Sequence, residues 1–132
     1  MRAERNRKRR KHEKGQSMVE FALVVPLLLI LVVGIFEFGR AWMTKNLVTG
    51  AAREAVRMYA VKDDVATANA RADIILSSGS LDLGRRSIAH TNSVNTVSYT
   101  ITYDFPTVIV GFIPGLDNIT LSSTTSMRRE WD

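Results

Sequence analysis

The longest apolar stretch of the sequence lies near its start. Residues 21–36 are sixteen consecutive uncharged positions, rich in Leu, Val and Ile. The carboxylates that flank this stretch, Glu20 and Glu37, are 17 residues apart, which is roughly 25 Å along an α-helix. Such a helix can cross a hydrocarbon core about 30 Å thick when both carboxylates lie near its boundaries. The pattern therefore predicts a membrane span over about residues 21–38.

The residues that follow the apolar run support an anchor that stays in the membrane. Phe36, Phe38 and Trp42 have the character of an interfacial aromatic belt. A cleaved secretory signal is the competing interpretation, but residues 37–40 lack the small side chains expected at such a cleavage site. Glu37 can also be neutralised by Arg40, three residues later on the same helix.

Positive charge is concentrated before the apolar run. Residues 1–15 hold eight of the 18 Lys and Arg residues but only two of the 13 acidic residues, so the rest of the chain has a net charge of −1. With almost no apolar content, this segment is expected to be disordered in isolation. Its charge favours a cytoplasmic N-terminus and translocation of the remainder. No aromatic residue is interleaved for stacking, which disfavours nucleic-acid binding.

Two residues of the apolar segment are unusual in a simple anchor. Pro26 offers no N–H to the carbonyl of Ala22, which predicts a kink or local unwinding. That feature fits a plain kinked anchor or a helix that loosens when it packs among its own copies. Glu20 costs several kcal/mol in this position unless it finds a partner. It is either a boundary residue at the headgroup level or the partner of a cation supplied by another chain.

The helical pattern continues beyond the span. Val48, Ala52, Ala55 and Tyr59 recur at spacings of four, three and four, which places them on one helical face. The pattern predicts a helix over about residues 16–60, with Gly50 as a candidate bend. This face can pack on the protein's own domain or on other subunits, and small alanines permit close approach in either case.

The remaining residues, 61–132, predict a small α+β domain. Asp63 or Asp64 can cap a second helix that runs to Leu76 and ends in the polar residues 77–80. Residues 95–105 alternate between apolar and polar side chains, as in a half-buried strand. Residues 118–127 read as a second strand, antiparallel to the first, with Ile119 and Leu121 facing inward. The apolar patch at residues 108–113 is predicted to be a loop or partial strand.

The sequence offers little chemistry. It has no cysteine, which excludes disulfides and thiolate ligands. His12 lies in the basic segment and His90 in a Ser/Asn-rich stretch, interpreted as a loop, so both are expected to be solvated. No His and carboxylate cluster has metal-binding spacing, and Gly79 and Gly84 do not form a phosphate loop. We therefore expect no catalytic, metal or cofactor site, and no enzyme.

A motif surrounds the start of the apolar run. The basic segment ends in Gly15, Gln16 follows, and Glu20 is the fifth residue counted from Gln16. This arrangement resembles the cleavage motif of type IV prepilins. Longer strings resemble the TadE-like pseudopilins of Flp/Tad pilus systems: Met18-Val-Glu-Phe-Ala-Leu-Val-Val-Pro-Leu-Leu-Leu, Gly34-Ile-Phe-Glu-Phe-Gly-Arg40, Ala51-Ala-Arg-Glu-Ala-Val-Arg57 and, more loosely, Met127-Arg-Arg-Glu130.

The resemblance implies a minor pilin of the bacterial inner membrane. It implies a cytoplasmic leader at residues 1–15, a prepilin peptidase that cuts between Gly15 and Gln16, and an assembly role for Glu20, Phe21 and Pro26. The implied partners are other pilins and pseudopilins, the Tad inner-membrane assembly platform and the lipid bilayer. Pilus biogenesis, adhesion and biofilm formation are the implied functions, with the domain in the periplasm or the extracellular pilus.

Two departures from related pilins favour a minor rather than a major subunit. The residue after the cut is Gln16, where better-known type IV pilins have Phe. Glu20 is followed by Phe21, where the shorter major Flp pilins typically have Tyr. The alternative is a single-pass anchor presenting a binding module that never enters a filament, and a membrane-anchored enzyme is disfavoured.

Overall fold

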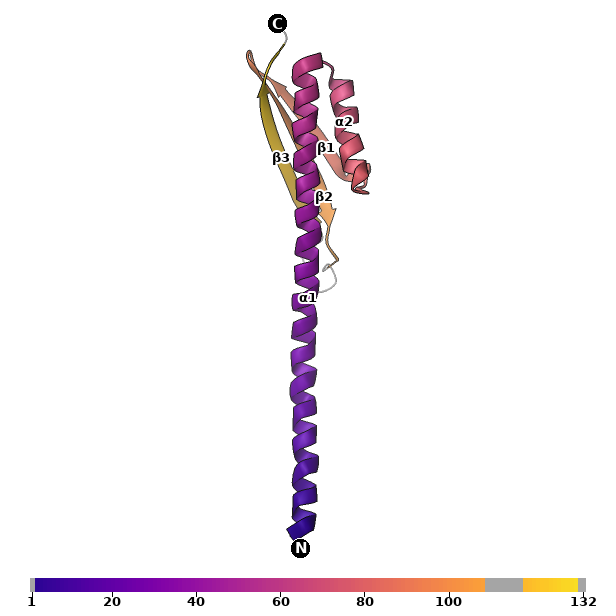
Figure 1. Ribbon diagram of the computed structural model, residues 1–132, viewed down its shortest axis with the longest axis vertical. Helices are drawn as coiled ribbons and strands as arrows, with labels where there is room; N and C mark the ends of the chain where they lie inside the picture. The colour runs from indigo at the N-terminus through magenta and orange to yellow at the C-terminus, as the bar shows by residue number, and fades with distance from the viewer. Residues whose placement is uncertain (1, 109–117, 131–132) are drawn as a thin grey trace. The chain divides into compact units, whose positions relative to one another are not determined.

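The fold combines a long helix, a second helix and a small antiparallel sheet, which confirms the predicted α+β class. The computed structural model describes residues 2–108 and 118–130. In chain order the elements are α1 (Arg2–Lys62), α2 (Val65–Ser78), the short 3-10 helix η1 (Leu83–Arg85), β1 (Arg86–Asn92), β2 (Thr96–Pro106) and β3 (Asn118–Arg128) (Figure 1). The chain divides into two compact units, Met1–Phe36 and Glu37–Asp132.

The first unit consists of the N-terminal part of α1. The helix begins at Arg2, whereas the basic leader was expected to be disordered in isolation. Arg, Lys, Glu and Ala are good helix formers, and extending an existing helix avoids the cost of nucleation. The helix also continues through Pro26. The apolar stretch within it is long enough to cross a membrane, and its side chains are not buried.

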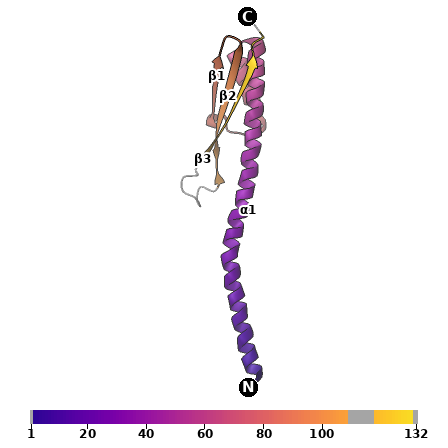
Figure 2. The ribbon, with the colours of Figure 1, turned by 90° about the vertical axis from the view of Figure 1, so that its left-hand side faces the viewer.

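The second unit is built on the C-terminal part of α1. The predicted face, Val48, Ala52, Ala55 and Tyr59, is buried in one core together with apolar residues of α2 and β2. Here α1 runs along the sheet beside α2 (Figures 1 and 2). This face therefore packs on the protein's own domain, which is the first of the two interpretations considered. Gly50 does not interrupt the helix.

Helix α2 begins and ends where its sequence signals predict. Of the two candidate caps it uses Asp64, whose carboxylate accepts hydrogen bonds from the backbone N–H groups of Ala66 and Thr67 at 3.0 and 3.2 Å. Arg71 on α2 also donates to Glu54 on α1 at 3.2 Å, and Arg57 donates to the same carboxylate at 2.9 and 3.0 Å. These hydrogen bonds, first that from Arg57, lower the pKa of Glu54.

The sheet has the order β1-β2-β3 and is antiparallel throughout. The alternation of β2 is confirmed, because Val97, Tyr99, Ile101, Tyr103 and Phe105 are all buried. The β2–β3 pairing is also as predicted. Of the two β3 residues expected to face inward, Leu121 packs against the core, but Ile119 is 37% exposed. Ile119 lies next to the first residue of its strand, where few neighbours can cover it.

Two further predictions concern the loops around the sheet. Strand β1 was missed, and it contains His90, which was assigned to a loop. Polar residues dominate this segment, and β1 gains its structure from pairing with β2, from Arg86 opposite Tyr103 to Asn92 opposite Val97. Most of the apolar patch at residues 108–113 lies outside the described residues.

The outer face of the sheet carries small hydroxyl side chains. Ser98 pairs with Ser126 at 2.8 Å and Thr100 pairs with Thr124 at 2.9 Å, both across the β2–β3 ladder. These pairs are solvent-facing, while the opposite face of β2 supplies the core. The sheet is therefore two-sided, as strict alternation requires.

Tyr99 is a core residue whose side chain carries a buried polar hydroxyl group. Its side chain is fully buried, and its hydroxyl has no hydrogen-bond partner among the described residues. Burial raises the pKa of Tyr99 to about 12. An unfolded tyrosine ionises near pH 10. The difference between the two pKa values therefore leaves the free energy of unfolding unchanged below about pH 10 and lowers it as pH rises from about 10 through about 12.

Tyr99→Phe is expected to raise the free energy of unfolding by about 1 kcal/mol at neutral pH, because it removes a buried hydroxyl without a partner. It should also reduce the loss of stability between pH 10 and 12. The matched control is Tyr103→Phe, since the Tyr103 hydroxyl accepts a hydrogen bond from the Asp82 N–H at 3.2 Å. That change should cost about 1 kcal/mol. Urea unfolding of the full chain in detergent compares them, and equal effects would refute this account of Tyr99.

Candidate functional site

The candidate residues lie on α1, in two groups on either side of the apolar stretch. The first group contains Gly15, Gln16, Glu20 and Phe21 and belongs to the first compact unit. The second contains Glu37 and Arg40 and belongs to the folded domain. Pro26 lies between them, exposed and inside the helix.

Around the predicted cleavage point the helix is open. Gly15, Gln16, Glu20 and Phe21 are all exposed, and a Cβ added at Gly15 would meet nothing within 4 Å. The peptide bond between Gly15 and Gln16 is nevertheless part of a helix. A peptidase acting on an extended substrate would have to unwind it, and glycine makes that easier by roughly 1 kcal/mol relative to alanine.

Glu20 has a neutral neighbour on its own helix. The side-chain amide of Gln16 donates a hydrogen bond to its Oε1 at 3.2 Å, across one helical turn. Within residues 15–108 and 118–130, no salt bridge includes Glu20. A single amide hydrogen bond does not neutralise a carboxylate, so Glu20 would need a cation as its partner in an apolar setting.

Glu37 is tied into the folded domain. The Arg40 guanidinium donates to its Oε2 at 2.9 Å, which confirms the geometry of the predicted pair. The backbone N–H of Val108 donates to its Oε1 at 2.7 Å, and Glu37 is only 5% exposed. Arg40 also lies over the ring of Phe105, 5.1 Å from its centroid. Glu37 thus connects α1 to the segment that directly follows β2.

The sequence predicted the Glu37–Arg40 pair but not the contacts of these two residues with Val108 and Phe105. The contact with Val108 spans 71 positions, and the one with Phe105 spans 65, so neither leaves a local signal. A buried carboxylate between two donors is a structural residue, because removing either partner leaves a desolvated group. Glu37 is therefore unlike Glu20, although both border the same apolar run.

His90 is not in the surroundings that the sequence suggested. Its ring lies on β1, 5.6 Å from the Tyr59 ring centroid and 5.7 Å from that of Tyr99. The residue remains exposed, as a solvated histidine was expected to be. In the described part of the chain no group of three His, Cys, Asp or Glu side chains could hold a metal ion.

Comparison with known proteins concerns the N-terminal half of the chain. A family model described as TadE-like protein matches residues 15–57. This segment includes both groups of candidate residues and most of the helical face that enters the core. The match confirms the resemblance over about a third of the chain and supports association with Tad pilus systems. No curated protein and no solved structure gives a significant match.

Proposed function

Because residues 15–57 are TadE-like, we propose that the protein is a minor pilin or pseudopilin that acts as a structural or assembly component of a Tad pilus. A prepilin peptidase would remove residues 1–15, and the mature chain would pack with its neighbours through α1. On this proposal the chain is not an enzyme. The observation that carries it is the position of Glu20, a carboxylate that lies at the head of an exposed apolar helix and forms no salt bridge within residues 15–108 and 118–130.

Cleavage would supply the missing charge. The new α-amino group would belong to Gln16, whose side chain already contacts Glu20 across one turn. An amino group and a carboxylate attract strongly where water is excluded, and well-aligned geometry can outweigh their desolvation. A regular packing of helices would provide such geometry between Glu20 of one chain and the amino group of another. Phe21 and Pro26, both exposed, would contribute to the same lateral contact.

The charge distribution favours one orientation in the inner membrane. Eight basic residues precede the apolar stretch, which holds the N-terminus in the cytoplasm. The domain formed by the rest of the chain would then lie outside, in the periplasm or in the pilus. There it would contact other pilins and pseudopilins, with the Tad inner-membrane platform as the assembly partner. If the chain is incorporated into the pilus, it would contribute to adhesion and biofilm formation.

One observation favours the alternative, a membrane-anchored binding module outside the filament. The helix runs without interruption from Arg2 through the Gly15–Gln16 bond, so the leader and the anchor form one element. If the leader is retained, Glu20 gains no amino group and lateral packing loses its charge pair. Removal or retention of residues 1–15 therefore distinguishes a pilus component from a membrane-anchored binding module.

Gly15→Leu is expected to trap the full-length chain, because the proposed peptidase requires a small residue before the cut. Wild type should migrate with the loss of fifteen residues, and the variant should not. The control is Gly39→Leu, a second helical glycine whose added Cβ would meet nothing within 4 Å. Immunoblots of membranes measure the difference. An unshifted wild-type band would favour the simple anchor.

A further inference from the structure

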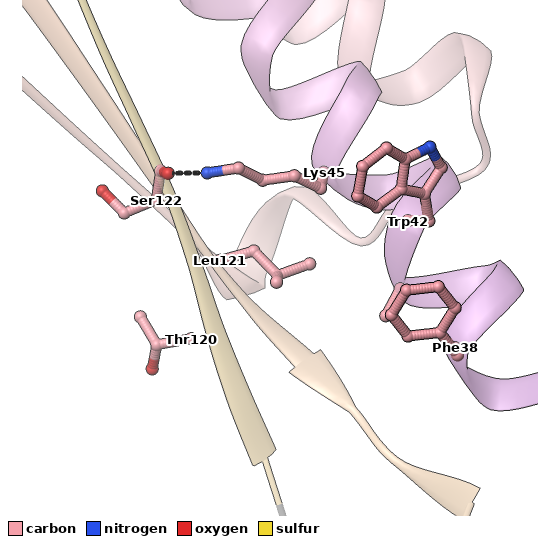
Figure 3. A pocket seen from close by; sticks show the side chains of 7 residues that line it. Phe38, Trp42, Lys45, Thr120, Leu121 and Ser122 are labelled. Atoms are coloured by element: carbon pink, nitrogen blue, oxygen red, sulfur yellow. Dashed lines mark hydrogen bonds between the residues drawn. The ribbon is translucent and has the colours of Figure 1, made fainter. Parts of the chain in front are cut away.

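A pocket lies at the base of the folded domain, between α1 and β3. Figure 3 shows Phe38, Trp42 and Lys45 on one side and Thr120, Leu121 and Ser122 on the other. Its volume is about 480 Å³, and Ala41 completes the lining. All of these residues belong to the same compact unit. The pocket is too small for a whole lipid or a protein element but is within the range of ligand sites.

The lining is apolar at one end and cationic at the other. Phe38, Trp42 and Lys45 follow one face of the helix at spacings of four and three residues. Phe38 and Trp42 are 69% and 61% exposed, and their ring centroids are 6.1 Å apart. From Phe38 to Lys45 the helix rises roughly 10 Å, which is enough to span the headgroup layer of one leaflet, about 5–8 Å thick.

The charges and hydrogen bonds of the lining restrict what can bind. Among the described lining residues, Lys45 is the one with a charge, and none of the others is acidic. The Lys45 ammonium donates to the backbone carbonyl of Ser122, as Figure 3 shows. An ammonium has three donors, so two remain for an anion. Because Lys45 also covers a carbonyl of the edge strand β3, pairing of this edge with a strand of another chain is disfavoured.

We propose that this pocket binds the headgroup and the upper acyl-chain region of one anionic membrane phospholipid. The upper part of an acyl chain lies against Phe38 and Leu121, the glycerol region lies beside Trp42, and the phosphate contacts Lys45. The order of these groups, apolar, amphipathic and cationic, is the order of Phe38, Trp42 and Lys45 along the helix. The inference rests on the membrane anchoring of the proposed function but not on cleavage or pilus assembly.

Trp42 provides the probe. The chain contains two tryptophans, so Trp131→Phe leaves Trp42 as the only one. This chain is placed in nanodiscs of zwitterionic phosphatidylcholine, and brominated phosphatidylglycerol or brominated phosphatidylcholine replaces part of the lipid. We expect brominated phosphatidylglycerol to quench Trp42 fluorescence at a lower mole fraction than brominated phosphatidylcholine. Soluble glycerol phosphate should not compete, because the acyl chain supplies part of the binding.

Lys45→Gln is expected to raise the half-quenching fraction of phosphatidylglycerol about fivefold, the factor that corresponds to one basic residue near an anionic surface. Lys45→Arg keeps the cation and should keep the preference. Arg53→Gln removes a charge from an exposed position of α1 outside the pocket and should have no effect. Circular dichroism of each variant confirms that the domain is folded.

Equal quenching of Trp42 by the two brominated lipids, in the Trp131→Phe chain with Lys45 unchanged, would overturn the lipid site. So would an unchanged preference in folded Lys45→Gln, or competition by glycerol phosphate alone. Weak quenching combined with cross-links from the pocket to a second chain would instead assign the pocket to a protein contact and reject the proposal. A cleaved, pilus-associated chain without lipid preference would remove this site and leave the proposed function intact.

Discussion

Glu20→Gln is expected to leave membrane insertion and cleavage intact and to abolish co-purification with Tad pilus components. Glutamine keeps the shape of the side chain and removes its charge, which makes insertion slightly easier. It also removes the attraction to a neighbouring amino group that the proposed packing requires. Membrane fractionation measures insertion, and affinity purification of the tagged chain measures association.

The controls separate charge from general damage. Glu20→Asp retains the charge with a shorter reach and should retain partial association. Glu54→Gln makes the same chemical change in the folded part of α1, at a solvent-facing ion pair that contributes about 0–1 kcal/mol. Glu37→Gln is a poor control because Glu37 is buried and holds the Val108 N–H. Normal association of Glu20→Gln would reduce Glu20 to a boundary residue, and its pilin-like role would be withdrawn.

Ile101→Ala is expected to lower the free energy of unfolding by about 3 kcal/mol, since it leaves a cavity in a packed core. Ile101 is fully buried on β2, in the cluster that joins the sheet to both helices. A domain of this size has a total stability of only about 5–15 kcal/mol, so the loss is a large fraction of it. Urea unfolding of the full chain in detergent, followed by circular dichroism, measures the change.

Thr100→Ala is the matched control on the same strand. Thr100 faces the other side of the sheet, where its hydroxyl meets that of Thr124 at 2.9 Å in a solvent-facing pair. Water can replace this hydrogen bond, so we expect a loss within about 1 kcal/mol. If the two variants lost equal stability, the assignment of the buried and exposed faces of β2 would be wrong.

The parts of the fold that were predicted correctly carry their signal in neighbouring residues. Strand β2 alternates with a period of two, and α2 has a capping carboxylate followed by apolar residues at helical spacing. The buried face of α1 is similarly visible from Val48 to Tyr59. In each case the residues that determine the element are close together in the sequence, so local physics is sufficient.

The parts that were missed depend on distant contacts. Strand β1 has a polar composition and becomes a strand because the edge of β2 is available to it. Ile119 is on the predicted face, opposite the buried Phe105, but it is 37% exposed, because alternation fixes the side of a sheet and not how far the core extends beneath the strand end. The leader is helical in the full chain, where the helix can propagate from the apolar segment, whereas the prediction of disorder concerned the leader in isolation.

The candidate site was predictable to a similar extent. The spacing of Gly15, Gln16 and Glu20 predicts a cleavage and assembly motif, and the structure adds that these residues are exposed and that Gln16 contacts Glu20. The Glu37–Arg40 pair was visible from its i, i+3 spacing. The burial of Glu37 and the pocket beneath β3 were not, because both are created by residues that lie more than 65 positions away.

On the proposed function, α1 becomes a processed, laterally packed membrane helix. The most direct measurement is the N-terminal sequence of the protein recovered from membranes of cells that contain the Tad system. We expect the mature chain to begin with Gln16, one turn before Glu20. A chain recovered only with residues 1–15 still attached would contradict it.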